Sequence, residues 1–351
     1  MQRLQPHKMW IISLLIFCSY LTACSSGGSA VKHTNQEIEN YDSGVYEQAV
    51  EHIKQTIKNH DFGKYEQPIA DYNRAIDLDP NNAVAHSSRG LAQKKSVNLE
   101  QAIADYNKAI ELNPNDAISY TSRGIAYKNA GDFEKAIADY SKAIELNPDD
   151  AASYNNRGIV YIESGNLKQA ISDYDNAINI NSKLATAYIG RGVAYASSGD
   201  YKKAISDFDK AIELDPGDAS AYSNRGNAYA NSDDFEHAIA DYSKAIYLNP
   251  EMASAYNGRG VVFASSGEYR QAIVDFYKAI KFDPNDALAF YNKGMAYLNC
   301  NDTEQAIEDF EQSLKLSPNA INQSEITKLI EKLKSEIQLK KRGRKRIGGR
   351  P

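Results

Sequence analysis

The feature that most constrains the fold of this 351-residue chain is a spacing of 34 residues that recurs without insertion or deletion. An arginine followed by a glycine marks it first, at Arg89 and Gly90. The pair returns every 34 residues as far as Arg259 and Gly260, after which Lys293 and Gly294 take the same place. A fixed period of this length indicates a repeat architecture, in which one small structural unit is stacked many times.

The repeats share one pattern of residue types. We number each repeat from position 1, which falls at residues 83, 117, 151, 185, 219, 253 and 287. Position 8 is glycine, position 20 is alanine, positions 4, 11 and 24 are mostly aromatic, and proline closes most repeats at position 32. Apolar residues follow a helical spacing over positions 2–14 and 17–30, which predicts two helices per repeat, called helix A and helix B. The small residues at positions 8 and 20 let the two helix axes approach closely.

This pattern resembles the tetratricopeptide repeat (TPR) family over seven repeats at residues 83–320, preceded by a degenerate first repeat or amino-terminal cap at 41–82. The resemblance implies an all-α fold, a right-handed superhelix of helical hairpins. A single hairpin buries too little apolar surface, so the repeats must stack into one solenoid. Aspartates directly before helix A, such as Asp116 and Asp150, are expected to cap it. An apolar helical spacing at 322–339 predicts a capping helix at 321–340 on the last repeat.

Arginine at position 7 and aspartate at position 23 recur together, one on each helix of a repeat. We predict a ladder of structural ion pairs, formed within repeats or between neighbours, and the alternative is a stripe of arginines that binds anions. Exposed pairs contribute only about 0–1 kcal/mol each. The predicted ladder consists of Arg123, Asp139, Arg157, Asp173, Arg191, Asp207, Arg225, Asp241, Arg259 and Asp275.

The amino terminus predicts export. A charged start precedes an apolar run of 15 residues, which is typical of a signal peptide and too short for an ordinary membrane-spanning helix of about 20 residues. Its end, Leu21-Thr22-Ala23-Cys24, resembles the lipobox of bacterial lipoproteins. The resemblance implies a signal peptide at 1–23, acylation of Cys24 and anchoring to a membrane through the lipid. An ordinary secretory signal, or a short anchor that contains a cysteine, is the alternative.

The residue after the cysteine bears on the membrane. Because Ser25 and not aspartate follows Cys24, resemblance to the sorting rule of two-membraned bacteria implies the outer membrane, facing the periplasm. In an organism with one membrane, the same signals would imply a lipoprotein of the cell membrane. Residues 24–40 are small and polar, which predicts a flexible tether.

Charge is distributed unevenly along the chain. Residues 24–339 carry 31 basic and 46 acidic side chains, whereas residues 340–351 carry seven basic and no acidic ones. We predict that 341–351 form a disordered basic tail. Such a tail would suggest nucleic acid in a cytosolic protein, but export argues against that partner. Contact with anionic envelope material and a merely solvated tail are both compatible with the sequence.

The sequence contains none of the motifs of phosphate-binding loops or zinc sites. Aspartate and glutamate are abundant, but they recur from repeat to repeat and so do not single out one acid–base pair. We therefore expect no catalysis, no cofactor and no metal. The oligomeric state is open.

The TPR resemblance implies a concave groove lined by positions 2, 5, 9, 12 and 13 of helix A, in which a partner protein binds as a peptide or a helix. The chaperone-binding members clamp a carboxylate with basic residues at positions 5 and 9, and these are absent here. Tyr291, Met295 and Leu298 share one helix face and are expected to form an apolar pocket, unless the carboxyl-terminal helix covers that face. The predicted groove residues are Lys94, Lys95, Lys128, Asn129, Asn155, Asn227, Asn257, Leu288, Tyr291, Met295 and Leu298.

Together these features predict a lipid-anchored TPR scaffold that mediates protein–protein interactions at the bacterial envelope. By analogy, lipoproteins of this shape dock peptidoglycan hydrolases and proteases, or guide a secretin for type IV pili. One alternative is a structural tether that links the outer membrane to an anionic wall polymer through the basic tail. Another is a regulatory subunit of an envelope enzyme. The sequence does not name the partner.

Overall fold

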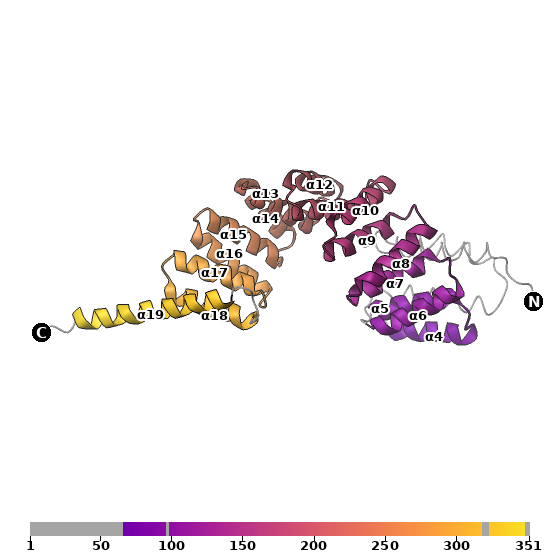
Figure 1. The fold of residues 1–351 in the computed structure, drawn as a ribbon, viewed down its shortest axis with the longest axis horizontal. Coiled ribbons are helices and arrows are strands. Elements are labelled where there is room, and N and C mark those ends of the chain that lie inside the picture. The colour runs from indigo at the N-terminus through magenta and orange to yellow at the C-terminus, as the bar shows by residue number, and fades with distance from the viewer. Residues whose placement is uncertain (1–65, 96–97, 318–322, 348–351) are drawn as a thin grey trace, which may run out of the picture. The chain divides into compact units, whose positions relative to one another are not determined.

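The computed structural model describes residues 66–95, 98–317 and 323–347 of the chain (Figure 1). The predicted signal peptide at 1–23, Cys24, the tether at 24–40 and most of the degenerate first repeat lie outside these residues. The described part contains sixteen α-helices, α4 to α19, and no strand. The all-α prediction is confirmed.

The helices form two compact units that divide between Ser164 and Gly165. The amino-terminal unit contains helix B of the degenerate repeat and the two repeats that follow it, together with helix A of the third. Its helices are α4 (Glu66–Leu78), α5 (Ala83–Lys95), α6 (Leu99–Leu112), α7 (Ala117–Asn129), α8 (Phe133–Leu146) and α9 (Ala151–Glu163).

The carboxyl-terminal unit continues the alternation of B and A helices to the end of the last repeat and adds one longer helix. Its helices are α10 (Leu167–Ile180), α11 (Ala185–Ser197), α12 (Tyr201–Leu214), α13 (Ala219–Asn231), α14 (Phe235–Leu248), α15 (Ala253–Ser265), α16 (Tyr269–Phe282), α17 (Ala287–Asn299), α18 (Thr303–Leu316) and α19 (Gln323–Ile347).

Local sequence sets the ends of the repeat helices. Helix A occupies positions 1–13, one residue earlier than predicted, and helix B occupies positions 17–30. The turn between them needs a residue with positive φ at position 15, which glycine adopts without steric cost, as at Gly199 with φ 82°. Asp233 takes the same conformation with φ 61°. Asp116 and Asp150 cap the next A helices as predicted, through their side-chain oxygens.

Alanines and aromatic rings form the core between helices. In the carboxyl-terminal unit, Phe208 of α12 is 1% exposed and packs with Ala204 and Ala228. Its ring lies against Gly192 of α11, where an added Cβ would stand 2.7 Å from the ring. Each A helix also contacts the next A helix within its unit. The A helices therefore form one layer and the B helices another.

The last helix differs from the prediction. A capping helix was expected at 321–340 and a disordered tail at 341–351, but α19 continues to Ile347 and so includes most of the basic segment. Lysine and arginine are good helix formers, and positive charge is favourable near a helix carboxyl terminus. Gly343 costs only about 1 kcal/mol in a helix that is already formed. Residues 348–351 lie outside the described part.

The first half of α19 covers the end of the solenoid. Ile326, Ile330 and Leu333 are buried and join the hydrophobic cluster around Phe310 of α18. An exposed ion pair joins Lys334 Nζ to Glu311 Oε1 at 2.6 Å. Among the described helices, α19 included, none combines the length and apolar character needed to span a membrane.

Candidate functional site

A pocket of about 250 Å³ opens on the A-helix layer of the carboxyl-terminal unit, between α15 and α17. The B helix between them, α16, contributes Tyr269 and Phe276 to its wall. The A helices supply the remaining lining residues, which are uncharged and mix apolar with polar groups. They are Val261, Ala264, Ser265, Asn292, Met295, Ala296 and Asn299.

Two substitutions relative to the preceding repeat explain the apolar wall of this pocket. In the preceding repeat, the hydroxyl of Tyr242 at position 24 donates a hydrogen bond to Asn227 Oδ1 at position 9, at 2.6 Å. In the pocket repeat, the same positions hold Phe276 and Val261. Phenylalanine has no hydroxyl and valine no polar group, so this polar bridge is replaced by an apolar pair. Val261 remains 41% exposed and accessible to a ligand.

Two asparagine amides are among the polar groups that line the pocket. Asn292 donates from Nδ2 to Asn257 Oδ1 at 3.2 Å, across the two neighbouring A helices. Asn299 donates from Nδ2 to the Met295 carbonyl oxygen at 2.9 Å. Each amide carries two N–H donors and an acceptor oxygen, so each has hydrogen-bonding capacity beyond these bonds. An apolar wall with adjacent amides suits a peptide whose side chain enters the pocket while its backbone bonds to the rim.

The structure separates the predicted apolar residues of the last repeat. Met295 lines the pocket and also packs against the cluster that α19 helps to form. Tyr291 and Leu298 pack against that cluster and do not line the pocket, and Leu288 is 59% exposed outside it. Tyr291 and Leu298 thus contact a cluster to which α19 contributes, and their role as an anchor for a partner stays a prediction.

The remaining predicted groove residues lie in both units. Asn227 and Asn257 belong to the carboxyl-terminal unit and make the hydrogen bonds described above. In the amino-terminal unit, Lys94 and Lys128 are half-buried, Asn129 is exposed and Asn155 is buried. The side chain of Lys95 lies outside the described part. A role for these residues in one continuous groove stays a prediction.

Sequence reasoning did not single out Phe276, Asn292 or Asn299. Asn299 stands at position 13, which the family pattern places in the groove, so it could have been found by that rule. Phe276 and Asn292 stand at positions 24 and 6, outside the rule. The sequence signal for Phe276 was the replacement of tyrosine by phenylalanine at position 24. Its consequence depends on which side chains pack against the ring.

The recurring arginines and aspartates lie together in the structure. In the carboxyl-terminal unit, Arg191 donates from Nε and Nη2 to the two carboxylate oxygens of Asp207, at 2.8 and 2.7 Å. Its Nη1 donates to Asp175 Oδ1 of the preceding repeat at 2.6 Å. The hydrogen bond to Asp207 raises the pKa of Arg191 above its ordinary value, and the bond to Asp175 adds to the effect. One guanidinium therefore joins helix A to two B helices.

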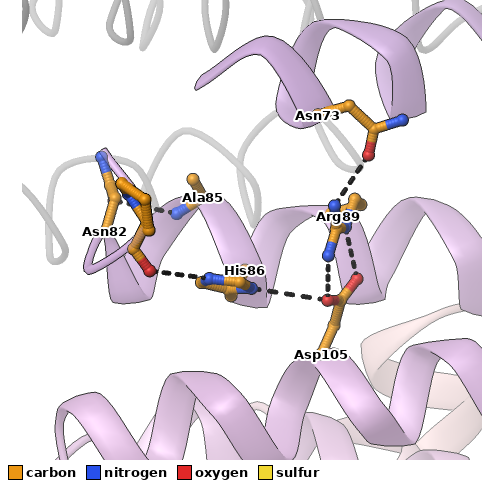
Figure 2. A network of polar contacts seen from close by, with 7 residues as sticks. Asn73, Asn82, Ala85, His86, Arg89 and Asp105 are labelled. Carbon is orange, nitrogen blue, oxygen red and sulfur yellow. Dashed lines mark hydrogen bonds and ion pairs between the residues drawn. The ribbon is translucent and has the colours of Figure 1, made fainter. Parts of the chain in front are cut away.

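The same arrangement recurs along both units. Figure 2 shows Arg89 between Asp105 of its own repeat and Asn73 of the preceding one, with His86 beside Asp105. Further bidentate pairs join Arg123 to Asp139, Arg225 to Asp241 and Arg259 to Asp275. Because these donors already bind carboxylates, the geometry favours a structural role over an open anion site.

Arg157 keeps the contact with the preceding repeat, and the last repeat departs from the regularity. Arg157 lies in the amino-terminal unit and Asp173 in the carboxyl-terminal unit; within its own unit, Arg157 donates to Ser141 Oγ at 2.8 Å. In the last repeat, Lys293 replaces arginine and reaches Asp309 Oδ1 at 3.1 Å. Asp309 Oδ2 is buried without a hydrogen-bond partner, and burial raises the pKa of this carboxyl above its ordinary value. The single ammonium of lysine cannot donate to both carboxylate oxygens in the bidentate geometry of an arginine guanidinium.

The described residues offer little to a metal ion. No group of three or more histidine, cysteine, aspartate or glutamate side chains in this part of the chain is arranged to hold one.

Comparison with known proteins places these observations in context. The sequence profile described as TPR repeat matches residues 60–97, 98–131, 126–165, 160–199 and 194–233. The profile described as tetratricopeptide repeat matches 219–252, 253–286 and 287–320. None of the curated proteins matches the sequence significantly.

Several solved structures are similar in fold. A tetratricopeptide repeat protein from Parabacteroides merdae is 23% identical, with 71% of this chain and 99% of that chain covered and a TM-score of 0.58. The Cut9–Hcn1 complex of the APC/C is 19% identical over 87% of this chain and 60% of that chain, with a TM-score of 0.60. Pseudomonas aeruginosa pilF is 19% identical over 60% and 96%, with a TM-score of 0.53. These likenesses show the fold alone.

Proposed function

Because the chain belongs to the tetratricopeptide repeat family, we propose that it is a lipid-anchored scaffold that docks a partner protein at the bacterial envelope. TPR repeats form scaffolds for protein–protein interactions and are generally not enzymes. The proposal adds the envelope location, which rests on residues 1–24, and the chemistry of the binding face. Acylated Cys24 would hold the protein on the outer membrane, facing the periplasm, or on the cell membrane of an organism that has only one.

The pocket between α15 and α17 carries the proposed mode of binding. Its lining has no charged side chain, with Val261 and Met295 on the apolar side and Asn292 and Asn299 on the polar side. Desolvating a charged ligand group there would lack an opposite charge to compensate for it. The proposed ligand is therefore an uncharged peptide segment or helix face of the partner, with an apolar side chain in the pocket.

Replacing Val261 with glutamate is expected to weaken partner binding by about tenfold or more, which corresponds to about 1.4 kcal/mol. The substitution puts a carboxylate into the apolar side of the pocket, where a bound ligand would desolvate it. Val261 tests the pocket better than Met295, because Met295 also supports the packing of α19. The partner is first captured with a photo-crosslinking amino acid at residue 261 in living cells, and its affinity is then measured by calorimetry.

Ala240 provides a matched control, since it is exposed on α14 in the B-helix layer. A crosslinker at residue 240 should not capture the same partner, and Ala240→Glu should leave the affinity unchanged. Equal capture from both residues, or equal loss of affinity in both variants, would place the binding site elsewhere.

Replacing Cys24 with serine should abolish acylation, because the hydroxyl does not take the place of the thiol in the lipoprotein pathway that the lipobox implies. We expect the variant to remain uncleaved or to be exported in soluble form. Metabolic labelling with a fatty-acid analogue measures this directly, and Cys300→Ser serves as the control with unchanged labelling. Undiminished labelling of Cys24→Ser would remove the lipoprotein part of the proposal.

A further inference from the structure

The exposed face of α16 differs from the same face of the other B helices. At position 22, the described repeats have alanine or serine, except for Val274 of α16 and Glu308 of α18. At position 25 they have asparagine, serine or aspartate, except for Tyr277 of α16 and Glu311 of α18. Val274 and Tyr277 are 61% and 63% exposed and lie three residues apart on one helix face. The other repeats show which residues these two positions normally hold, and the valine and tyrosine of α16 depart from that pattern.

The ladder explains why position 25 is free to change here. In other repeats, the residue at position 25 accepts a hydrogen bond from Nη1 of the next arginine, as Ser243 does from Arg259 at 2.8 Å. After α16, the arginine is replaced by Lys293, whose ammonium binds Asp309. A lysine has a single ammonium group, so it lacks the additional guanidinium nitrogen that donates to position 25 in the other repeats. Tyr277 therefore has no part in the ladder, and the fold does not account for an exposed aromatic ring at this place.

The two departing helices carry opposite charges. Beside Val274 and Tyr277, α16 carries Arg270, Lys278 and Lys281. Its aspartate, Asp275, is buried and bound to Arg259. The exposed face of α18 instead carries three acidic residues, Glu304, Glu308 and Glu311, and ends on Lys315, which occupies the same position as Lys281 of α16. The face of α16 defined by Arg270, Val274, Tyr277 and Lys278 is called the basic patch below, and the three glutamates are called the acidic patch.

Both patches lie in the B-helix layer, because α16 and α18 each pack on α17, between them in the chain. A two-fold axis parallel to the helices and midway between the patches would place the basic patch of one copy over the acidic patch of a second copy. The same operation would form the reciprocal contact, so the surface is self-complementary. Glu311 already binds Lys334, but this pair is about half exposed and exchangeable at low cost.

We propose that a second copy of this chain docks on the α16–α18 face, with Val274 and Tyr277 at the centre of each contact and the opposite charges around them. This interface uses the B-helix layer and leaves the pocket between α15 and α17 open. It does not depend on the proposed function, because it needs neither the lipid nor the partner. A scaffold with this interface would present two pockets at once and bind a two-fold partner with higher avidity.

Reversing the charge of one patch at a time tests the arrangement. One variant carries Arg270→Glu and Lys278→Glu, and the other carries Glu304→Lys and Glu308→Lys. Each variant alone would place like charges opposite each other in both contacts, so we expect its self-association to weaken by about tenfold or more. A mixture of the two variants would restore opposite charges in both contacts. We therefore expect dimers in the mixture that contain one copy of each variant.

The measurement is sedimentation equilibrium of the full chain in a density-matched detergent, at low and high salt, with one variant fluorescently labelled. Lys142→Glu with Lys210→Glu is the matched control, because these lysines occupy the position of Lys278 on α8 and α12. The control should dimerise like the unchanged chain. Circular dichroism establishes that each variant is folded.

Tyr277→Asp provides a second test if a charge-reversed variant does not fold, and it should also abolish the dimer. A monomeric unchanged chain at low salt would overturn the proposal. So would dimers that persist in both reversed variants and in Tyr277→Asp, or a mixture of folded variants that yields no mixed dimer.

Discussion

Replacing Phe208 with alanine is expected to lower the free energy of unfolding of the carboxyl-terminal unit by about 3–5 kcal/mol. The ring is 1% exposed between α11, α12 and α13, where Ala204 and Ala228 pack against it and Gly192 leaves no Cβ to fill the vacated space. The cost combines the lost burial of the ring with the cavity that remains.

Denaturant unfolding followed by circular dichroism measures this loss, and hydrogen exchange localises it. The stability of a solenoid is approximately a sum over repeats and their interfaces, so the loss of protection should centre on α11 to α13. Tyr247→Ala is the control, because Tyr247 is 77% exposed and its loss should change the stability by less than about 0.5 kcal/mol. Equal effects of the two substitutions would contradict the assigned packing.

Removing an aspartate from the ladder should lower the free energy of unfolding more where the arginine keeps only a neutral hydrogen-bond partner. After Asp275→Ala, Arg259 retains the hydroxyl of Ser243, whereas after Asp207→Ala, Arg191 retains the carboxylate of Asp175. A half-buried guanidinium without a carboxylate loses its strongest hydrogen bonds. We expect losses of about 2–3 kcal/mol for Asp275→Ala and about 1–2 kcal/mol for Asp207→Ala.

Double-mutant cycles with Arg259→Leu and Arg191→Leu measure the coupling in each pair. The leucine variants should be at least as destabilising as the aspartate variants, because they leave the more deeply buried carboxylate without its partner. The ladder would lose its support if neither cycle showed coupling. A larger loss of stability for Asp207→Ala than for Asp275→Ala would contradict the role of the residue at position 25 as the second hydrogen-bond acceptor.

The repeat helices could be predicted from the sequence because their causes are local. Helical spacing, the aspartate caps and the left-handed turn at position 15 act within a few residues, so the helix boundaries were predicted to within one residue. The pairing of positions 7 and 23 could be inferred because both recur with the same period. The second acceptor at position 25 could not, because asparagine, aspartate and serine share this place and only the packing of neighbouring repeats brings it to Nη1.

The end of the chain was predicted less well for a related reason. A basic segment with glycines reads as disordered when it is considered alone, but α19 already exists on its amino-terminal side and extends into it as far as Ile347. Packing of Ile326 and Ile330 against the last repeat provides the nucleus, and adding a residue to an existing helix costs far less than starting one. The tether function that the basic tail suggests stays a hypothesis.

The sequence by itself determined the repeat, the two helices within it and the recurrence of arginine with aspartate, because each follows from spacing along the chain. Only the tertiary structure decided that the joint of α15, α16 and α17 opens into a pocket. The pocket depends on Phe276 meeting Val261 and Asn292 from two A helices, where the preceding joint has a tyrosine hydroxyl bonded to Asn227. Space between helices depends on which side chains meet there, and residues far apart in the sequence are brought together only when the repeats stack.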